Sequence, residues 1–455
     1  MSQQRVPTAL GTEKVSKLLM QYAVPSIIAM TASSLYNMVD SIFIGQGVGA
    51  MAISGIAITF PLMNITAAFG SLVGVGAATL TSVKLGQKDY DTARRVLGNV
   101  FVLNILLGVL LTVVTLPILD PILYFFGASD NTIPYARDYM QIILIGNMVT
   151  HLYFGLNALL RSSGHPEKAM FATIATVLVN TILDPIFIYV FDLGIRGAAI
   201  ATILSQMTAM AWQCRLFCNK NEILHFERGI YKLRASHVSN IIGIGMSPFL
   251  MNSCSCLIVI LFNNSLAHYG GDMAVGAFGI VNRISFLFFM VIFGINQGMQ
   301  PIAGYNYGAQ QYDRLMQVVK YAMICATIIS ILGWLVSELI PGICARAFTT
   351  DQKLIDMSEH GLRLANIVMF IIGYQIVVTN FFQSIGKARV SIFLSLSRQL
   401  IFLLPLLLIL PPVFGLEGVW YSLPASDLTA AIVTFFMMSR YMKKLKAQQK
   451  AQEHE

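Results

Sequence analysis

The chain has 455 residues, of which 56% are hydrophobic and 11% are charged, and its mean hydropathy is +0.69. A soluble domain carries roughly 25% charged residues, so this composition excludes a globular protein with a water-covered surface. The formal net charge is +8, and its meaning depends on where the basic residues lie along the chain.

Uncharged apolar stretches recur along the whole chain, and a stretch of about 18 or more residues can cross roughly 30 Å of hydrocarbon. The first such stretch is too long for the core of a signal peptide, so we expect the N-terminal segment to be retained. Six spans are expected in the first half, near residues 18–44, 52–82, 96–119, 137–160, 169–191 and 196–218. Six more are expected in the second half, near residues 238–266, 274–304, 316–340, 362–385, 390–413 and 416–439.

Lys and Arg residues concentrate in alternate loops. The N-terminus, the C-terminal tail and the loops on their side hold 23 of the 30 basic residues, whereas the opposite loops hold five. Short loops rich in Lys and Arg remain in the cytoplasm. We therefore expect a multi-pass protein of a bacterial-type cytoplasmic (inner) membrane with both termini cytoplasmic, and we interpret the basic tail as a membrane-side anchor, with no nucleic-acid partner.

The two halves of the chain form an internal repeat at an offset of 222 residues. The segment LGQKDYDTARRV after the second predicted span aligns with YGAQQYDRLMQV after the eighth, which pairs Gly86 with Gly308 and Asp91 with Asp313. Because each repeat has an even number of spans, the repeats begin on the same side and are related by a pseudo-twofold axis along the membrane normal. The predicted parts are an N-lobe (1–218), a linker (219–236), a C-lobe (237–440) and a tail (441–455).

This pattern predicts an all-α polytopic membrane protein with twelve transmembrane helices in two pseudo-twofold-related six-helix bundles. Two related bundles can rock about a site between them, and this movement gives alternating access. The repeat therefore favours a transporter over a channel or a receptor.

Asp40 and Asp184 stand out well inside predicted spans of the first half, where a charge costs about 2.5–3.5 kcal/mol on insertion scales. Asp40 and Asp184 are expected at a similar depth, with Asn180 one helical turn before Asp184 and Thr202 at the same level. Pro185 frees a backbone carbonyl next to them. These hard oxygen ligands suit a proton or a small cation such as Na⁺. The alternative is a pair of protonated, structural carboxyls.

A second set of charges lies in the second half. Arg398 and Asp427 are expected at the same depth of consecutive antiparallel spans, and we interpret them as a buried structural ion pair. A role in substrate passage is the alternative. Aromatic and polar residues could line a substrate cleft through packing and cation–π contacts, and the candidates are Tyr36, Tyr153, Asn157, Arg283, Phe286 and Tyr374.

Four segments resemble the multidrug and toxic compound extrusion (MATE) family, in particular its DinF-like branch, and the resemblance covers essentially the whole chain. These segments are SLYNMVDSIFIGQ, LGQKDYDTARR, LLRSSGHP and NTILDPIFIYV. The resemblance implies two lobes of six helices and export of organic cations and amphipathic drugs coupled to inward flow of Na⁺ or H⁺. The cation site of DinF-like members falls here on Asp40, Asn180, Asp184 and Thr202. Helices 7, 8 and 10, which carry acids in the NorM-like branch, have none in this sequence.

The sequence thus predicts a cation-coupled multidrug antiporter that acts as a monomer and has no cofactor apart from its coupling ion. A flippase for lipid-linked oligosaccharides would need more intramembrane cations than Arg283 and Arg398. An intramembrane enzyme would need clustered ligands or nucleophiles, and the seven histidines form no HExxH motif. No GxxxxGK[ST] motif is present, so ATP hydrolysis is not expected to supply the energy.

Overall fold

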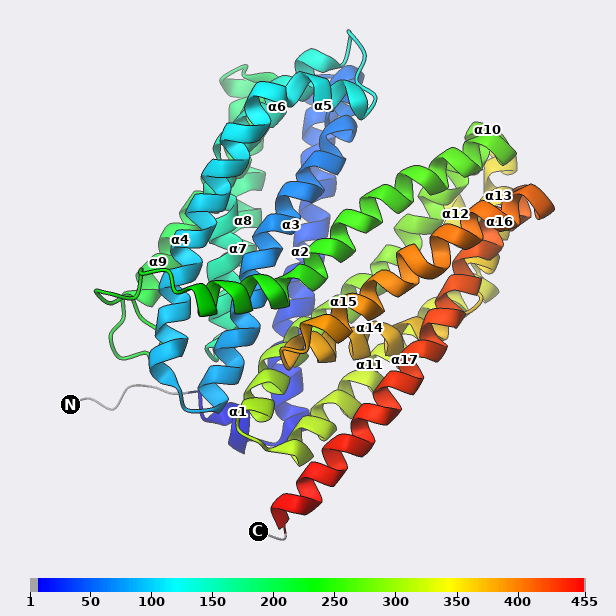
Figure 1. Ribbon diagram of the computed structural model, residues 1–455. Coiled ribbons are helices and arrows are strands. Elements are labelled where there is room, and N and C mark those ends of the chain that lie inside the picture. Colours follow the sequence, from blue (N-terminus) through cyan, green and yellow to red (C-terminus); the bar gives the residue numbers. More distant parts are fainter. Residues whose placement is uncertain (1–6, 454–455) are drawn as a thin grey trace. The chain divides into compact units, whose positions relative to one another are not determined.

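The structure is a computed structural model that describes residues 7–453, with all of their side chains except those of Asn37, Met38, Ala50 and residues 451–453. Within this range the backbone forms helices and loops, without a β-strand (Figure 1). The chain divides into two compact units, and each is described separately. Unit 1 comprises the residues up to Thr12 together with Ile28–Phe249, and unit 2 comprises Glu13–Ile27 together with the residues from Leu250 onward.

The first half of the chain starts with a short helix, and a loop of residues 218–234 follows its last helix. The helices are α1 (Ala9–Thr12), α2 (Val15–Gly47), α3 (Ala50–Gly86), α4 (Tyr90–Thr115), the 3₁₀ turn η1 (Leu116–Ile118), α5 (Leu119–Phe125), α6 (Ile133–Ile145), α7 (Asn147–Ser162), α8 (Pro166–Pro185), the π-helical turn η2 (Ile186–Val190) and α9 (Gly194–Phe217). In unit 1, α3 packs against both α4 and α7, and α8 packs against α9.

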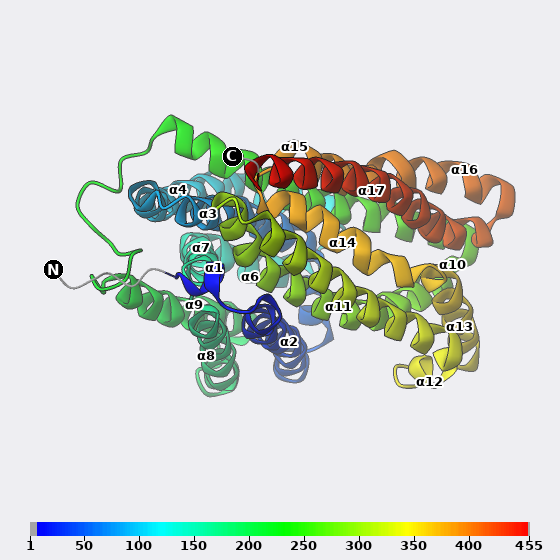
Figure 2. The same ribbon diagram turned by 90° about the horizontal axis from the view of Figure 1, so that it is seen from below.

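The second half repeats this succession of long and broken helices. Its elements are α10 (Ala235–Gly308), α11 (Tyr312–Leu339), α12 (Pro341–Arg346), α13 (Gln352–Asn366), α14 (Met369–Ser384), α15 (Ala388–Leu396), the π-helical turn η3 (Ser397–Leu403), α16 (Leu404–Phe414) and α17 (Leu416–Glu453). In unit 2, α14 packs against both α11 and α17 and lies between them in Figure 2.

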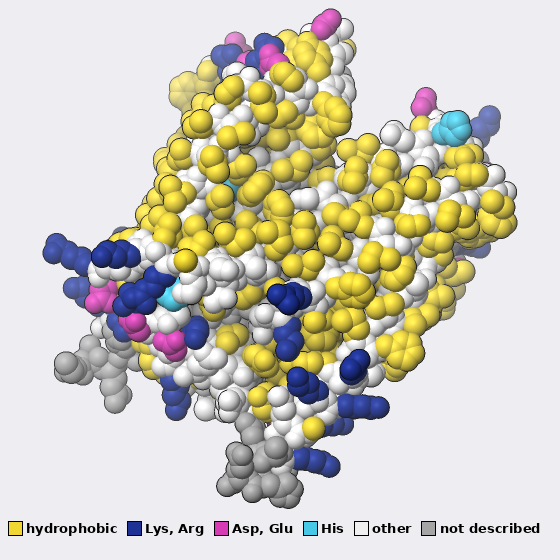
Figure 3. Space-filling model, in the orientation of Figure 1, with side chains coloured by type: hydrophobic (Ala, Val, Ile, Leu, Met, Phe, Trp, Pro, Cys, Tyr) yellow, Lys and Arg dark blue, Asp and Glu magenta, His cyan; other side chains and the backbone are white. Residues whose placement is uncertain are grey.

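The twelve predicted spans all coincide with helices of the described range, so the predicted fold class is confirmed. Among residues 7–453, eight helices are long and apolar enough to cross a membrane, or up to ten if each bent pair is one span. The 74-residue helix α10 leaves helical geometry at Gly271 (φ 69°) and therefore holds two spans. Helix α9 has 24 residues and is long enough as well. Hydrophobic side chains cover the visible flanks of the helices, whereas Lys and Arg gather around the loop after α9 and near the end of α17 (Figure 3).

Two predicted spans are sharply bent. The span predicted at 137–160 consists of α6 and α7 with a bend of 55°, and that at 362–385 involves α13 and α14 with a bend of 51°. At the first bend, a Cβ on Gly146 would collide with the side chain of Ile203. Close approach of α9 thus requires a glycine at this position.

The limits of the units differ from the predicted lobes, because the first parts of α2 and α10 pack with the other half of the chain. Residues 13–27 belong to unit 2 and residues 237–249 to unit 1. Glycines explain both placements. A Cβ on Gly298 of α10 would lie 2.5 Å from the backbone nitrogen of Ala23, and a Cβ on Gly76 of α3 would collide with the carbonyl of Ile241. Each pair of helices therefore packs backbone against backbone.

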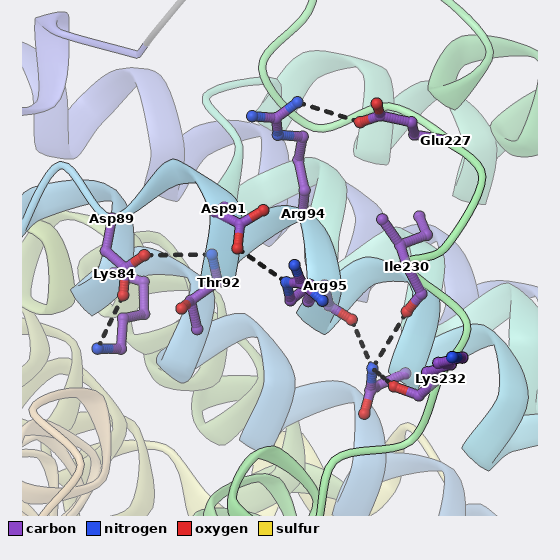
Figure 4. Close-up of polar contacts among 10 residues, drawn as sticks. Lys84, Asp89, Asp91, Thr92, Arg94, Arg95, Glu227, Ile230 and Lys232 are labelled. Carbon is purple, nitrogen blue, oxygen red and sulfur yellow. Dashed lines mark hydrogen bonds and ion pairs between the residues drawn. The ribbon is translucent and has the colours of Figure 1, made fainter.

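The loop after α9 is held against the first turns of α4 in unit 1 by an ion pair and hydrogen bonds (Figure 4). Arg94 forms an ion pair with Glu227 at 3.2 Å, and the Asn99 amide donates to the carbonyls of Ile230 and Lys232 at 3.3 and 3.2 Å. Asp89 caps α4 by accepting a hydrogen bond from the Thr92 backbone N–H at 3.2 Å. This loop is thus a structured part of unit 1.

Candidate functional site

The candidate site is built around two carboxyl groups inside unit 1. Asp40 lies in the last two turns of α2 and is 8% exposed, and Asp184 near the end of α8 is completely buried. Their carboxyl groups lie within hydrogen-bonding reach of one another. Two carboxylates in contact repel one another unless a proton or a cation lies between them. The contact is therefore a reason to expect an ion at this place.

An amide and a hydroxyl complete the predicted set. With the Asn180 amide oriented so that both of its ends are satisfied, its nitrogen donates to Oδ2 of Asp184 at 2.8 Å. Its oxygen then accepts from the backbone N–H of Thr202 at 3.0 Å. The structure thus brings together Asp40, Asn180, Asp184 and Thr202, the four residues that the sequence suggested.

Two tyrosine hydroxyls extend this network. The hydroxyl of Tyr36, four residues before Asp40 on α2, lies 3.1 Å from Oγ1 of Thr202. Tyr139 of α6 is 3% exposed and its hydroxyl lies near the Thr202 side chain. The sequence suggested Tyr36 only as a cleft residue and gave no role to Tyr139. A buried tyrosine hydroxyl needs a hydrogen-bond partner. This general rule was the only ground in the sequence on which Tyr139 could have been assigned to the site.

The backbone next to Asp184 departs from α-helical geometry. Pro185 has no N–H to donate, and the chain continues as the π-helical turn η2 before α9 begins. Such π-turns inside helices are frequent at functional sites. Asp184 therefore lies where the α-helical hydrogen-bond pattern is interrupted.

The site fits a proton or a small hard cation. Oδ1 of Asp40 is buried and has no hydrogen-bond partner among the described residues. None of the ion pairs in the described range includes Asp40 or Asp184. In the same range, no three His, Cys, Asp or Glu side chains come together as a metal site. A bound Na⁺ would therefore use a mixed set of carboxylate, amide and hydroxyl oxygens.

The remaining candidate residues do not join this site. Tyr153 and Asn157 are buried in unit 1, where the Tyr153 hydroxyl donates to Thr173 Oγ1 at 3.3 Å and the Asn157 amide donates to the Ala169 carbonyl at 3.0 Å. Both therefore tie α7 to α8. The other three candidates lie in unit 2, namely the exposed residues Arg283 and Phe286 on α10 and the partly buried Tyr374 on α14.

The charged pair of unit 2 is present as well. Nε of Arg398 donates to Oδ1 of Asp427 at 2.6 Å, and the side chains are 31% and 6% exposed respectively. The sequence prediction that these two residues meet therefore agrees with the geometry.

Several known proteins are similar to this chain over almost its whole length. The multidrug export protein MepA of Staphylococcus aureus (strain MSSA476) is 29% identical over 430 residues, which cover 94% of this chain and 95% of that protein. MepA of Staphylococcus haemolyticus is 28% identical over 432 residues and 93% of each chain. Among solved structures, the MATE multidrug transporter DinF-BH is 36% identical with a TM-score of 0.89, over 97% of this chain and 98% of that one.

A second solved structure shows the same fold at lower identity. It is an outward-facing MATE family transporter of the MOP superfamily, 24% identical with a TM-score of 0.91, over 98% of this chain and all of that one. The MatE family itself matches residues 25–186 and 244–409, and these two segments include Asp40, Asp184 and Arg398. The match covers well over half of the chain and falls on both halves of the internal repeat, so this protein belongs to the MatE family of membrane-spanning transporters.

Proposed function

We propose that the protein is a secondary active multidrug exporter that moves amphipathic or cationic organic compounds out of the cell by alternating access, coupled to inward flow of H⁺ or Na⁺. The observation that carries the proposal is the contact between the buried carboxyls of Asp40 and Asp184, with an unpartnered Oδ1 on Asp40. The names of its relatives support the substrate class, since MepA is a multidrug export protein and DinF-BH is a multidrug transporter.

The ion acts by changing the charge of unit 1. With Asp40 and Asp184 ionised, the site is negative and favours a state that binds a cationic substrate. Entry of a proton or Na⁺ from outside neutralises the pair, Asn180 and Thr202 supply the remaining oxygens, and the backbone around Pro185 rearranges. Differential affinity of the two states for ion and substrate is what couples the two fluxes.

The proposed place of action is a bacterial-type cytoplasmic membrane, with both termini in the cytoplasm and a single chain as the working unit. The excess of Lys and Arg in alternate loops supports this orientation. The two repeats within one chain supply both bundles that alternating access requires.

The decisive experiment uses purified protein in proteoliposomes loaded with a fluorescent organic cation. A Na⁺ gradient and a pH gradient are imposed separately, with the membrane potential clamped. We expect export under one gradient and none without a gradient. Export that needs neither gradient would contradict ion coupling, and the absence of dye movement under both would contradict multidrug export.

A further inference from the structure

The charged pair of unit 2 lies in the middle of its spans. Arg398 is ten residues after the start of α15, and Asp427 is eleven residues after the start of α17. At 1.5 Å per residue these positions are about 15 Å deep, the midpoint of a layer roughly 30 Å thick. A charge at this depth faces either protein or water, because exposure to lipid is costly.

The two partners differ in exposure. The Asp427 side chain is 6% exposed, whereas the Arg398 side chain is 31% exposed. Because exposure of a guanidinium to lipid at the midpoint of a span is costly, the exposed side of Arg398 is expected to border water.

The ion pair uses only part of the guanidinium. Asp427 accepts from Nε of Arg398 at 2.6 Å, and within the described range neither Nη atom has a hydrogen-bond partner. A guanidinium has five N–H donors in a fixed plane, so its outer edge remains available for a second carboxylate. Asp427 fixes the direction of this edge.

Gln399, which follows Arg398 in the sequence, carries a buried hydrogen-bond acceptor. The Gln399 amide nitrogen donates to Oγ of Ser255 on α10 at 2.7 Å, but its Oε1 is buried and has no hydrogen-bond partner among the described residues. Both Arg398 and Gln399 belong to the π-helical turn η3, where seven residues depart from α-helical spacing. Turns of this kind are frequent at functional sites.

We propose that Arg398 is a ligand-binding residue of unit 2 that receives the carboxylate of zwitterionic amphipathic substrates. This inference rests on the proposed export function and extends it from cations to compounds that carry both charges. The outer edge of the guanidinium donates to the substrate carboxylate, and Asp427 positions the guanidinium. The acidic site of unit 1 has no cation that could serve this purpose.

Two matched dyes test the proposal. The first is a rhodamine ethyl ester, which carries one positive charge, and the second is the free acid of the same dye, with the same ring system. Binding of each dye to the purified full-length protein is measured by fluorescence anisotropy at pH 8. We expect Arg398→Gln to weaken binding of the free acid about tenfold or more, since a hydrogen bond to a charged group is lost. Binding of the ester should change less than about twofold.

Two further variants separate recognition from folding. Arg398→Gln leaves a buried carboxylate unpaired, so the double variant Arg398→Gln with Asp427→Asn removes both charges and is expected to show the same selective loss. Arg398→Lys keeps the charge but not the planar fork, and should recover part of the affinity for the free acid.

Equal losses for both dyes in the double variant, or no loss for either, would overturn the inference and leave Arg398 and Asp427 with a purely structural role. Failure of the native protein to bind either dye would overturn the proposed function together with the inference. Native binding of both dyes without dependence on Arg398 would overturn the inference alone.

Discussion

The carboxyl group of Asp40 on α2 meets that of Asp184 on α8, and Oδ1 of Asp40 has no hydrogen-bond partner in the described range. We expect Asp40→Asn and Asp184→Asn each to lower ion-driven dye export at least about tenfold. An amide does not take up a proton near neutral pH, and it has no negative charge with which to bind a cation. Export is measured as dye efflux from cells with matched expression. Asp130→Asn, on an exposed loop of the same unit, is the control and should export normally. Full export by both site variants would refute the assignment.

Tyr139 should affect the strength of ion binding. Tyr139→Phe removes the hydroxyl that lies near the Thr202 side chain and keeps the buried ring. A hydrogen bond contributes about 1 kcal/mol, so we expect roughly a fivefold rise in the ion concentration that gives half-maximal export. Tyr135→Phe on the same helix is the control, because the Tyr135 hydroxyl has no hydrogen bond in the described range. An unchanged half-maximal concentration in Tyr139→Phe would show that Tyr139 is not part of the ion site.

Gly298 should be essential for the packing of α10 in unit 2. A Cβ there would lie 2.5 Å from the backbone nitrogen of Ala23, whereas a Cβ on Gly279 of the same helix meets nothing within 4 Å. We expect Gly298→Ala to destabilise the protein by about 1–3 kcal/mol through overpacking. Gly279→Ala should be neutral or stabilising by up to about 1 kcal/mol. Thermal unfolding in detergent measures both, and equal midpoints would contradict the close approach.

Asp89 should stabilise α4 in a pH-dependent way. Although burial raises it, hydrogen bonds from Thr92 and Lys84 together with the charge of Lys84 hold the pKa of Asp89 below its usual value. A lowered pKa means that the cap stabilises the fold above the pKa of the unfolded chain, about 3.9. The stabilisation is lost as the pH falls through the lower folded-state pKa. We therefore expect Asp89→Ala to cost about 1 kcal/mol at pH 7 and less at low pH, as measured by the unfolding midpoint.

A matched substitution isolates the charge. Asp89→Asn keeps the hydrogen bond to the Thr92 N–H, since asparagine is an equally good cap, and it removes the titration. The stability of Asp89→Asn relative to the native protein should change with pH where Asp89 titrates, while the capping hydrogen bond to the Thr92 N–H remains. If Asp89→Ala cost the same at low pH as at pH 7, the ionised carboxylate would not be the capping group.

The orientation of the chain can be tested with single cysteines in a cysteine-free background. Lys88→Cys, between α3 and α4, should react with a membrane-impermeant maleimide only after the cells are opened. Asp130→Cys, between α5 and α6, should react in intact cells. The opposite pattern would reverse the proposed topology.

Hydropathy and repeat spacing predicted the helices well, because each span must satisfy its own backbone hydrogen bonds in lipid. The same reasoning about depth placed Asp40 next to Asp184, although their role as an ion site stays a prediction. The bend at Gly146 and the contact of Tyr139 with Thr202 were not predicted. Both depend on which helix approaches from elsewhere in the chain, and one sequence carries no direct record of such partners.

The division of the units also has a consequence for biosynthesis. Residues 13–27 leave the ribosome early, but the glycines against which they pack, Gly294 and Gly298, are made some 270 residues later. Unit 1 in turn is incomplete until Phe249 has been synthesised. The first 13 residues of α2 therefore lack their final neighbours until most of the protein has been made, so unit 2 completes its packing only after every segment of unit 1 has been synthesised.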